Sequence, residues 1–258
     1  MDYKDIRIEK KEEIAYLILN RPEVSNMLRR EMFLEIIDGL KELDADDDVR
    51  LIIVKGAGEN FCFGADLSEI AKLDEEGARR FFSSLGEMYK AFHHIDKVSI
   101  AMVHGYCTAG GMGIALSCDL IVAAEDAKFG STAVKAGLFC MPISGVMLPK
   151  LIGGKKALEM TLTAELIDGK EAERLGVVNK AVPMDKLETT TLEMAEKILS
   201  RSPLAVIMGR RNFYACADME YDKGIEYSTD MFAALAATAG AKEGIKAFLG
   251  KNKARRSK

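Results

Sequence analysis

The sequence has 258 residues, 48% of them hydrophobic and 29% charged, so the chain is long enough to bury a sizeable core. The formal net charge of −4 and the absence of a basic stripe argue against a nucleic-acid-binding surface. The cysteine count is five and no pair has C-x-x-C spacing, so we expect neither a disulfide framework nor a metal site.

The first residues, MDYKDIRIEK, do not resemble a signal peptide, so we expect a cytoplasmic protein. One uncharged stretch, residues 98–118, is long enough to cross a bilayer. It contains His104, two serines and several glycines, and we therefore interpret it as a buried strand, a loop and a buried helix.

The N-terminal part of the chain alternates between strand-like and helix-like patterns. Residues 5–20 predict a β-hairpin with a charged turn. Apolar residues at helical spacing predict helices over 28–43 and 75–92. Short β-rich runs predict further strands at 51–58, 98–106 and 120–126. The alternation predicts an α/β fold with largely parallel, buried strands.

The C-terminal part is mostly helical in pattern. Helices are predicted at 155–165, 170–176 and 185–199, with a short strand-like run at 177–183. Ser202-Pro203 predicts a new helix start with a capping serine, and helical pattern continues to about residue 250. The apolar residues of this last region predict contact with a neighbouring subunit.

The glycine-rich stretch GYCTAGGMGIAL (105–116) carries no charge and lies between a predicted strand and a predicted helix. The first turn of a helix has free N–H groups, and its dipole favours an anion or a carbonyl oxygen that becomes one. Neither the G-x-x-x-x-G-K-[ST] nor the G-x-G-x-x-G phosphate motif is present. A purely structural tight turn is the alternative interpretation.

A second loop, NFCFGADLSEI (60–70), has the same pattern of strand, glycine turn and helix start near Asp66. Two such loops could direct one N–H each at a single oxygen. That arrangement is an oxyanion hole, and it suits a thioester carbonyl that turns into an enolate.

The sequence resembles the enoyl-CoA hydratase/isomerase (crotonase) superfamily over nearly its whole length. The matching stretches, in order, are LNRPEVSN, NFCFGADL, VHGYCTAGGMGIALSCDLIVAAEDAKFG, IDGKEAERLGVVNKAVP and AKEGIKAFLGK. The resemblance implies a spiral of ββα units over residues 1–200 and a helical C-terminal trimerisation region over 201–258. It also implies a CoA thioester as substrate without a further cofactor, and a homotrimer or dimer of trimers.

The resemblance also assigns site residues. The backbone N–H groups of Ala65 and Gly110 match the oxyanion hole of the family. The positions that match CoA- or acyl-binding residues are Val24, Ser25, Ala65, Asp66, Leu67, Phe248 and Lys251, of which the last two serve in relatives across a subunit boundary.

The chain departs from the hydratase pattern at the two catalytic glutamates, whose positions fall on Gly113 and Ala133. Hydration needs a base for water and an acid for the α-carbon, and neither residue supplies one. The aspartates that other relatives use fall on Met141 and Cys140, and a tyrosine of the dihydroxynaphthoyl-CoA synthases falls on Ala236.

The polar residues that remain near these motifs are weak candidates for proton carriers, nucleophiles or substrate contacts: His104, Cys62, Cys107, Cys140, Thr108, Ser131, Thr132, Ser144 and Lys135. For His104 and the cysteines, a buried structural role is the alternative. For Lys135, the alternative is an exposed position on the surface without a role in the site.

Two hypotheses follow from these residues. The first is a lyase or isomerase that stabilises a thioester enolate and is not a standard hydratase; decarboxylation, isomerisation and C–C bond chemistry all fit. The second is a catalytically degenerate relative that binds an acyl-CoA without chemistry.

Overall fold

The computed structural model describes the backbone of residues 3–141 and 143–256, and within these ranges the side chains of all residues except 143, 144 and 251–256. The chain divides into two compact units, Met1–Ala195 and Glu196–Lys258. The resemblance places the corresponding boundary at residue 200. In the described part of the chain, no helix is long and apolar enough to span a membrane.

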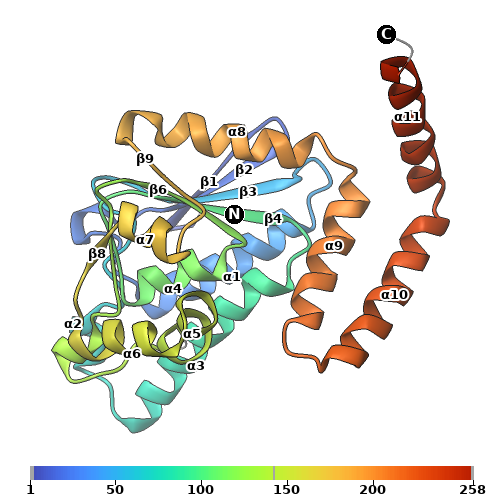
Figure 1. Ribbon diagram of the computed structural model, residues 1–258. Helices are drawn as coiled ribbons and strands as arrows, with labels where there is room; N and C mark the ends of the chain where they lie inside the picture. Colours follow the sequence, from blue (N-terminus) through green and yellow to red (C-terminus); the bar gives the residue numbers. More distant parts are fainter. Residues whose placement is uncertain (1–2, 142, 257–258) are drawn as a thin grey trace. The chain divides into compact units, whose positions relative to one another are not determined.

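The main sheet of the first unit has six strands in the order β1-β2-β3-β4-β6-β9 (Figure 1). Only the hairpin is antiparallel, and the other neighbouring pairs run parallel. The strands are β1 (Ile6–Lys11), β2 (Ile14–Leu19), β3 (Leu51–Gly56), β4 (Val98–Val103), β6 (Leu120–Ala124) and β9 (Lys180–Val182). The predicted hairpin and the largely parallel α/β arrangement are confirmed.

Long helices cover this sheet. Helices α1 (Arg30–Asp44) and α3 (Glu75–His94) pack against each other, with the rings of Phe33 and Phe81 edge-on at 5.0 Å between centroids. They lie on the opposite side of the sheet from α8 (Leu187–Leu199) in Figure 1. β2, β3 and β4 are almost entirely buried, as strands covered on both faces must be.

A second, three-stranded sheet positions the glycine-rich loops. Its strands are β5 (Tyr106–Thr108), β7 (Lys128–Gly130) and β8 (Ile167–Asp168). An isolated bridge joins Cys62 to Cys107 at the side of β5. The buried helix α4 (Gly110–Ser117) follows β5 almost directly, so the uncharged segment 98–118 is a strand, a loop, a short strand and a buried helix, as expected apart from β5.

Shorter helical elements connect the rest of the first unit: η1 (Pro22–Val24), α2 (Leu67–Ile70), η2 (Ala133–Ala136), η3 (Ile143–Met147), α5 (Leu148–Ile152), α6 (Gly154–Thr163), α7 (Gly169–Leu175) and η4 (Met184–Lys186).

The second unit is entirely helical in its ordered elements: α9 (Pro203–Cys216), α10 (Tyr221–Ala237) and α11 (Ala239–Arg256). Ser202 does occupy the N-cap position of α9 and Pro203 the first turn, but the serine side chain makes no capping hydrogen bond. The predicted helix start is therefore confirmed, but the predicted capping bond is wrong, because the Ser202 hydroxyl accepts no hydrogen bond from the N–H groups of the first turn. Helical structure reaches Arg256 rather than residue 250.

Candidate functional site

The loop at residues 60–67 is fastened to its neighbours by backbone hydrogen bonds. Cys62 N–H donates to the Tyr106 carbonyl at 2.9 Å, which ties the loop to β5. Leu28 N–H donates to the Gly64 carbonyl, and Asp66 N–H donates to the Leu28 carbonyl, both at 2.8 Å. These bonds hold the residues on either side of Ala65 and leave the Ala65 N–H unused.

The second loop turns sharply at Ala109, whose backbone has φ 45° and ψ −120°. A residue with a Cβ rarely adopts a positive φ, so this turn is strained. The Ala109 N–H donates to the Gly130 carbonyl of β7 at 2.9 Å, and Gly110 begins α4 directly afterwards. The strained turn therefore joins β5 to the first residue of α4, whose N–H has no partner within the helix.

The two loops meet at van der Waals distance. A Cβ built on Gly64, where φ is +108°, would lie 2.8 Å from the Ala109 Cβ and 3.1 Å from the Gly110 nitrogen. A Cβ built on Gly110 would lie 3.4 Å from the Ala65 nitrogen. Only glycine at position 64 permits both this backbone conformation and this approach.

The nitrogens of Ala65 and Gly110 are thus close neighbours. Among the residues that the structure describes, neither N–H donates to a backbone or side-chain acceptor. Two free backbone donors from different loops, one of them at the first turn of a helix, form a suitable site for a carbonyl oxygen that gains negative charge.

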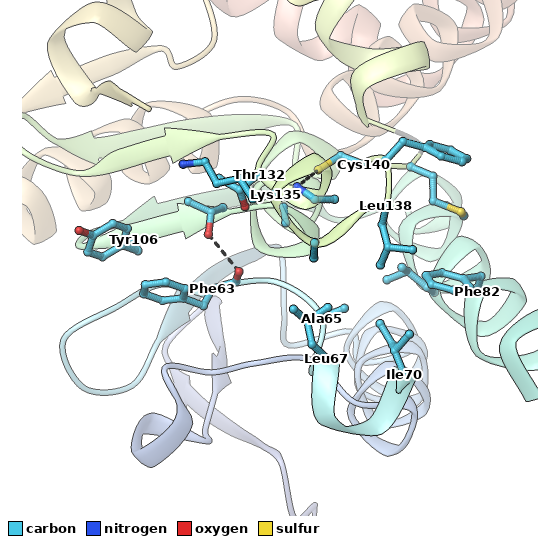
Figure 2. Close-up of a pocket in the computed structure, with 18 of the residues that line it drawn as sticks. Phe63, Ala65, Leu67, Ile70, Phe82, Tyr106, Thr132, Lys135, Leu138 and Cys140 are labelled. Atoms are coloured by element: carbon cyan, nitrogen blue, oxygen red, sulfur yellow. Dashed lines mark hydrogen bonds between the residues drawn. The ribbon is translucent and has the colours of Figure 1, made fainter. Parts of the chain in front are cut away.

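Both loops open into a pocket of about 440 Å³ (Figure 2). Ala65 and Gly110 lie on its lining with apolar side chains from the 60–67 loop, α2, α3 and the 132–141 segment: Phe63, Leu67, Ile70, Phe82, Leu85, Leu138, Phe139 and Met141. Within the described lining, Lys135 is the charged side chain, and there is no Asp, Glu or His. The pocket therefore suits an apolar group attached to the carbonyl.

Four of the expected site residues, Thr132, Ala133, Lys135 and Cys140, lie on one wall of the pocket. Ala133 belongs to η2, and its N–H donates to the Cys140 sulfur at 3.4 Å on the same wall. Thr132 and Lys135 project from this wall too, opposite Phe63 and Ala65 in Figure 2. The side chain of Ser144 lies outside the described residues.

Gly113 lies one turn into α4, and the ring of Tyr89 from α3 occupies the space beside it. A Cβ built on Gly113 would lie 2.5 Å from the Tyr89 hydroxyl oxygen and 2.6 Å from two ring carbons. The hydroxyl itself donates to the Gly110 carbonyl at 3.1 Å. Sequence reasoning missed Tyr89, because its helical pattern shows only that it belongs to the buried face of α3.

The thiols of Cys62 and Cys107 are buried and held in their unreactive, protonated form. The Cys62 thiol donates to the Asn26 carbonyl at 3.1 Å, and burial raises the pKa of Cys62 to about 12. Burial likewise raises the pKa of Cys107 well above its usual value. Both stay protonated near neutral pH, so the structural interpretation holds for these two residues. His104 donates from Nε2 to the Gly58 carbonyl at 2.9 Å and does not line the pocket.

The positions that match CoA- or acyl-binding residues of the family fall in two places. Ser25 follows Val24 at the end of η1, and its carbonyl accepts the Phe63 N–H at 3.1 Å, which places both beside the first loop. Leu67 lines the pocket and is half exposed. Phe248 belongs to α11 in the second unit, and the side chain of Lys251 lies outside the described residues.

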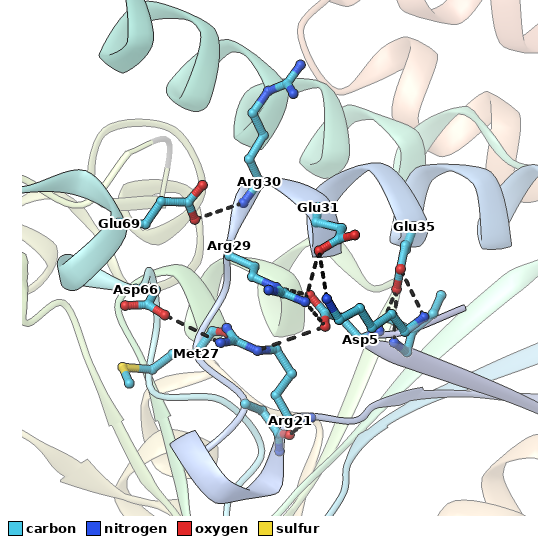
Figure 3. A network of polar contacts seen from close by, with 12 residues as sticks. Asp5, Arg21, Met27, Arg29, Arg30, Glu31, Glu35, Asp66 and Glu69 are labelled. Atoms are coloured by element: carbon cyan, nitrogen blue, oxygen red, sulfur yellow. Dashed lines mark hydrogen bonds and ion pairs between the residues drawn. The ribbon is translucent and has the colours of Figure 1, made fainter. Parts of the chain in front are cut away.

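Asp66 caps α2 and joins a charged network (Figure 3). Its carboxylate accepts from the Ser68 N–H at 3.1 Å and from the Ser68 hydroxyl at 2.6 Å. The hydroxyl bond chiefly, with help from Arg21, holds the pKa of Asp66 below its usual value. Arg21 contacts both Asp66 and Asp5, and Arg29 pairs with Asp5 through two hydrogen bonds at 2.5 and 2.6 Å. The network links Asp66, the residue next to Ala65, to Asp5 just before β1.

No metal centre is evident in this arrangement. Over the described residues, no group of three or more His, Cys, Asp or Glu side chains is placed to hold a metal ion.

Comparison with known proteins identifies the family of this chain. A family model described as Enoyl-CoA hydratase/isomerase matches residues 9–257. A crotonyl-CoA hydratase from Syntrophomonas wolfei is 34% identical over 255 residues, which cover 98% of each chain. A hydroxycinnamoyl-CoA hydratase-lyase from Pseudomonas fluorescens is 28% identical over 257 residues, covering 96% of this chain and 92% of that protein.

Among solved structures, an enoyl-CoA hydratase from Mycobacterium smegmatis superposes with a TM-score of 0.93 at 31% identity, covering 96% of this chain and 97% of that one. The expected crotonase fold, an α/β core with two sheets and a helical C-terminal region, is therefore confirmed. The chain belongs to the enoyl-CoA hydratase/isomerase family.

Proposed function

We propose that this protein is an enzyme that binds a CoA thioester and stabilises its enolate between the N–H groups of Ala65 and Gly110. The observation that carries the proposal is the close approach of these two free donors, where a Cβ built on Gly110 would lie 3.4 Å from the Ala65 nitrogen. Donors fixed in a pocket with little water act strongly on charge that develops in the transition state.

We further propose that the reaction is not plain hydration of an enoyl-CoA. Hydration would use carboxylates at positions 113 and 133, which are glycine and alanine here. The Tyr89 ring also fills the space that a side chain at position 113 would need. Each missing acid or base costs about 100-fold or more in rate, so turnover of crotonyl-CoA should be feeble.

Loss of CO2 from a malonyl-type thioester needs the fewest catalytic groups in this pocket, because no base has to remove a proton to form the enolate. The bond between the α-carbon and the carboxylate carbon breaks, and its electron pair moves into the enolate whose oxygen the two N–H groups hold. CO2 leaves, and a proton from water then reaches the α-carbon. A double-bond shift or a retro-aldol cleavage also forms an enolate, but each needs a polar group to move a proton.

We also propose that CoA lies along Val24, Ser25, Ala65, Asp66 and Leu67, and that the protein forms a homotrimer or a dimer of trimers in which Phe248 and Lys251 complete a neighbouring site. Support comes from the second unit, where Phe213, Phe232 and Phe248 are each about two-thirds or more exposed. Light scattering coupled to gel filtration tests the oligomer, and a monomer would contradict it.

The reaction is tested by mass spectrometry of a panel of acyl-CoA thioesters incubated with the protein in D2O. The panel contains crotonyl, dienoyl, malonyl, methylmalonyl, alicyclic and aromatic thioesters. We expect CO2 loss, isomerisation or C–C cleavage in at least one member and little water gain in crotonyl-CoA. Rapid hydration of crotonyl-CoA would contradict the proposal. An unchanged panel with demonstrated binding would favour the acyl-CoA-binding alternative.

A further inference from the structure

Tyr89 is a buried polar residue to which the proposed reaction assigns no role. It projects from α3, is only 3% exposed, and lies behind the oxyanion loop rather than on the pocket lining. Its hydroxyl makes a long-range hydrogen bond to the Gly110 carbonyl at 3.1 Å, across 21 residues of sequence. The bond therefore joins α3 to the first residue of α4.

The residue before Gly110 is the strained Ala109. A backbone conformation of this kind persists only where the surrounding structure holds it on more than one side. On one side, the Ala109 N–H is held by the Gly130 carbonyl at 2.9 Å. On the other, the Tyr89 hydroxyl holds the Gly110 carbonyl. The peptide that carries the Gly110 N–H lies between these two fixed points.

The ring of Tyr89 is also matched to α4. A Cβ on Gly113 would meet the hydroxyl oxygen at 2.5 Å and the ring at 2.6 Å, whereas the glycine leaves room for the ring. A Cβ on Gly110 would lie 3.4 Å from the same hydroxyl oxygen and 3.4 Å from the Ala65 nitrogen. The phenol of Tyr89 therefore packs against Gly110 and Gly113, within a few ångströms of both proposed donors.

The hydroxyl is fitted to act as a permanent donor. Burial raises the pKa of Tyr89 well above its usual value, so the group stays protonated across the accessible pH range. A carbonyl oxygen has two lone pairs, so the Gly110 carbonyl can accept this bond in addition to a hydrogen bond within α4.

We propose that Tyr89 is the positioning residue of the oxyanion hole: its hydroxyl and ring fix the first turn of α4, so that the Gly110 N–H stays directed at the same point as the Ala65 N–H. This inference rests on the proposed function. Donors in such a site must be held to within about 0.5 Å, which a strained loop alone does not guarantee. Gly113 is then the residue that makes room for Tyr89, as well as the position of an absent acid.

The test uses infrared difference spectroscopy of butyryl-CoA labelled with 13C at the thioester carbonyl and bound to the full-length protein. Wild type should lower the carbonyl stretching frequency relative to free butyryl-CoA. Tyr89→Phe keeps the ring and should lose at least half of that shift, while the dissociation constant for butyryl-CoA changes by less than about threefold. The matched control is Tyr16→Phe, a buried tyrosine of β2 away from the pocket, which should keep the full shift.

A second variant approaches the same contact from α4. Gly113→Ala leaves Tyr89 in the sequence but places a methyl group where the ring now lies, and it should reduce the shift as Tyr89→Phe does. Circular dichroism confirms that each variant is folded. A full wild-type shift in folded Tyr89→Phe would overturn the inference and leave the proposed function standing. A wild type that binds butyryl-CoA without any shift would overturn the oxyanion hole itself and this inference with it.

Discussion

The two walls of the pocket are built in different ways. On one wall, the 60–67 loop and the start of α4 expose mainly backbone, and hydrogen bonds fix the residues around both donors: Leu28 holds either side of Ala65, and Gly130 and Tyr89 hold either side of the Ala109–Gly110 peptide. On the other, the 132–141 segment exposes side chains, with Phe139 73% exposed. We therefore propose that the backbone wall carries the thioester chemistry and that the side-chain wall selects the acyl group.

The largest effect is expected from Gly113→Glu, which introduces the glutamate that the resemblance predicts at this position of a hydratase. Its Cβ would overlap Tyr89, and a carboxylate would be buried against an apolar ring, so we expect a loss of about 3 kcal/mol or more in the free energy of unfolding. Urea denaturation measures it. Gly113→Glu combined with Tyr89→Ala removes the overlap and should recover part of the loss. A stable Gly113→Glu single variant would contradict the account of this wall.

Gly64→Ala should disrupt the backbone wall with the fold retained. The added methyl group would press on Ala109 and on the Gly110 nitrogen, at a φ that alanine rarely adopts, so the two donors should separate. Loss of one oxyanion donor costs about 100-fold in turnover, and we expect a decrease of that order with the reactive member of the acyl-CoA panel. Gly86→Ala, where a Cβ meets nothing within 4 Å, is the matched control. Equal turnover in both variants would rule out the proposed geometry.

Asp66→Asn should weaken the same wall at its outer end by about 1 kcal/mol, because it keeps a side-chain cap but removes the negative charge at the helix start and the ion pair with Arg21. The pKa of Asp66 is below its usual value in the folded protein, so its charge stabilises the fold at neutral pH and this contribution is lost as pH falls through the folded pKa. The difference in unfolding free energy between wild type and variant should therefore shrink below about pH 4. A difference that stays constant from pH 7 to pH 3 would show that the charge is unimportant.

The smallest effect is expected on the side-chain wall, at Lys135. The lysine is exposed, lies on the pocket lining and has no acidic partner among the described residues. Lys135→Met should weaken binding of malonyl-CoA about threefold more than binding of butyryl-CoA, the scale of an exposed ion pair. Isothermal titration calorimetry with both ligands measures the ratio, and Lys72→Met, an exposed lysine outside the lining, serves as control. An equal loss of affinity for both ligands would contradict a contact between Lys135 and the carboxylate of the acyl group.

Local patterns in the sequence were sufficient for most of the fold. The hairpin, the strands at β3, β4 and β6, and helices α1 and α3 agree with the structure to within a few residues, because each has a regular apolar period. The short strands β5, β7 and β8 were not predicted as a sheet, because two or three residues carry no period and their pairing depends on contacts distant in sequence.

The same limit applies to the candidate site. The two glycine loops were recognisable from strand, turn and helix signals, and the structure brings Ala65 and Gly110 together. The pairing of Tyr89 with Gly113 and the strain at Ala109 are tertiary features, and no local pattern marks them. The roles of Phe248 and Lys251 depend on a neighbouring subunit and stay predictions.

The central claim is that two backbone N–H groups grip the oxygen of a thioester, and the most direct test compares two ligands that differ only in that oxygen. We would measure the dissociation constants of butyryl-CoA and of the thioether analogue in which a methylene replaces the carbonyl. Two hydrogen bonds to a neutral carbonyl predict about tenfold tighter binding of the thioester, and Gly64→Ala should abolish the difference. Equal affinities in the wild-type protein would contradict the oxyanion hole.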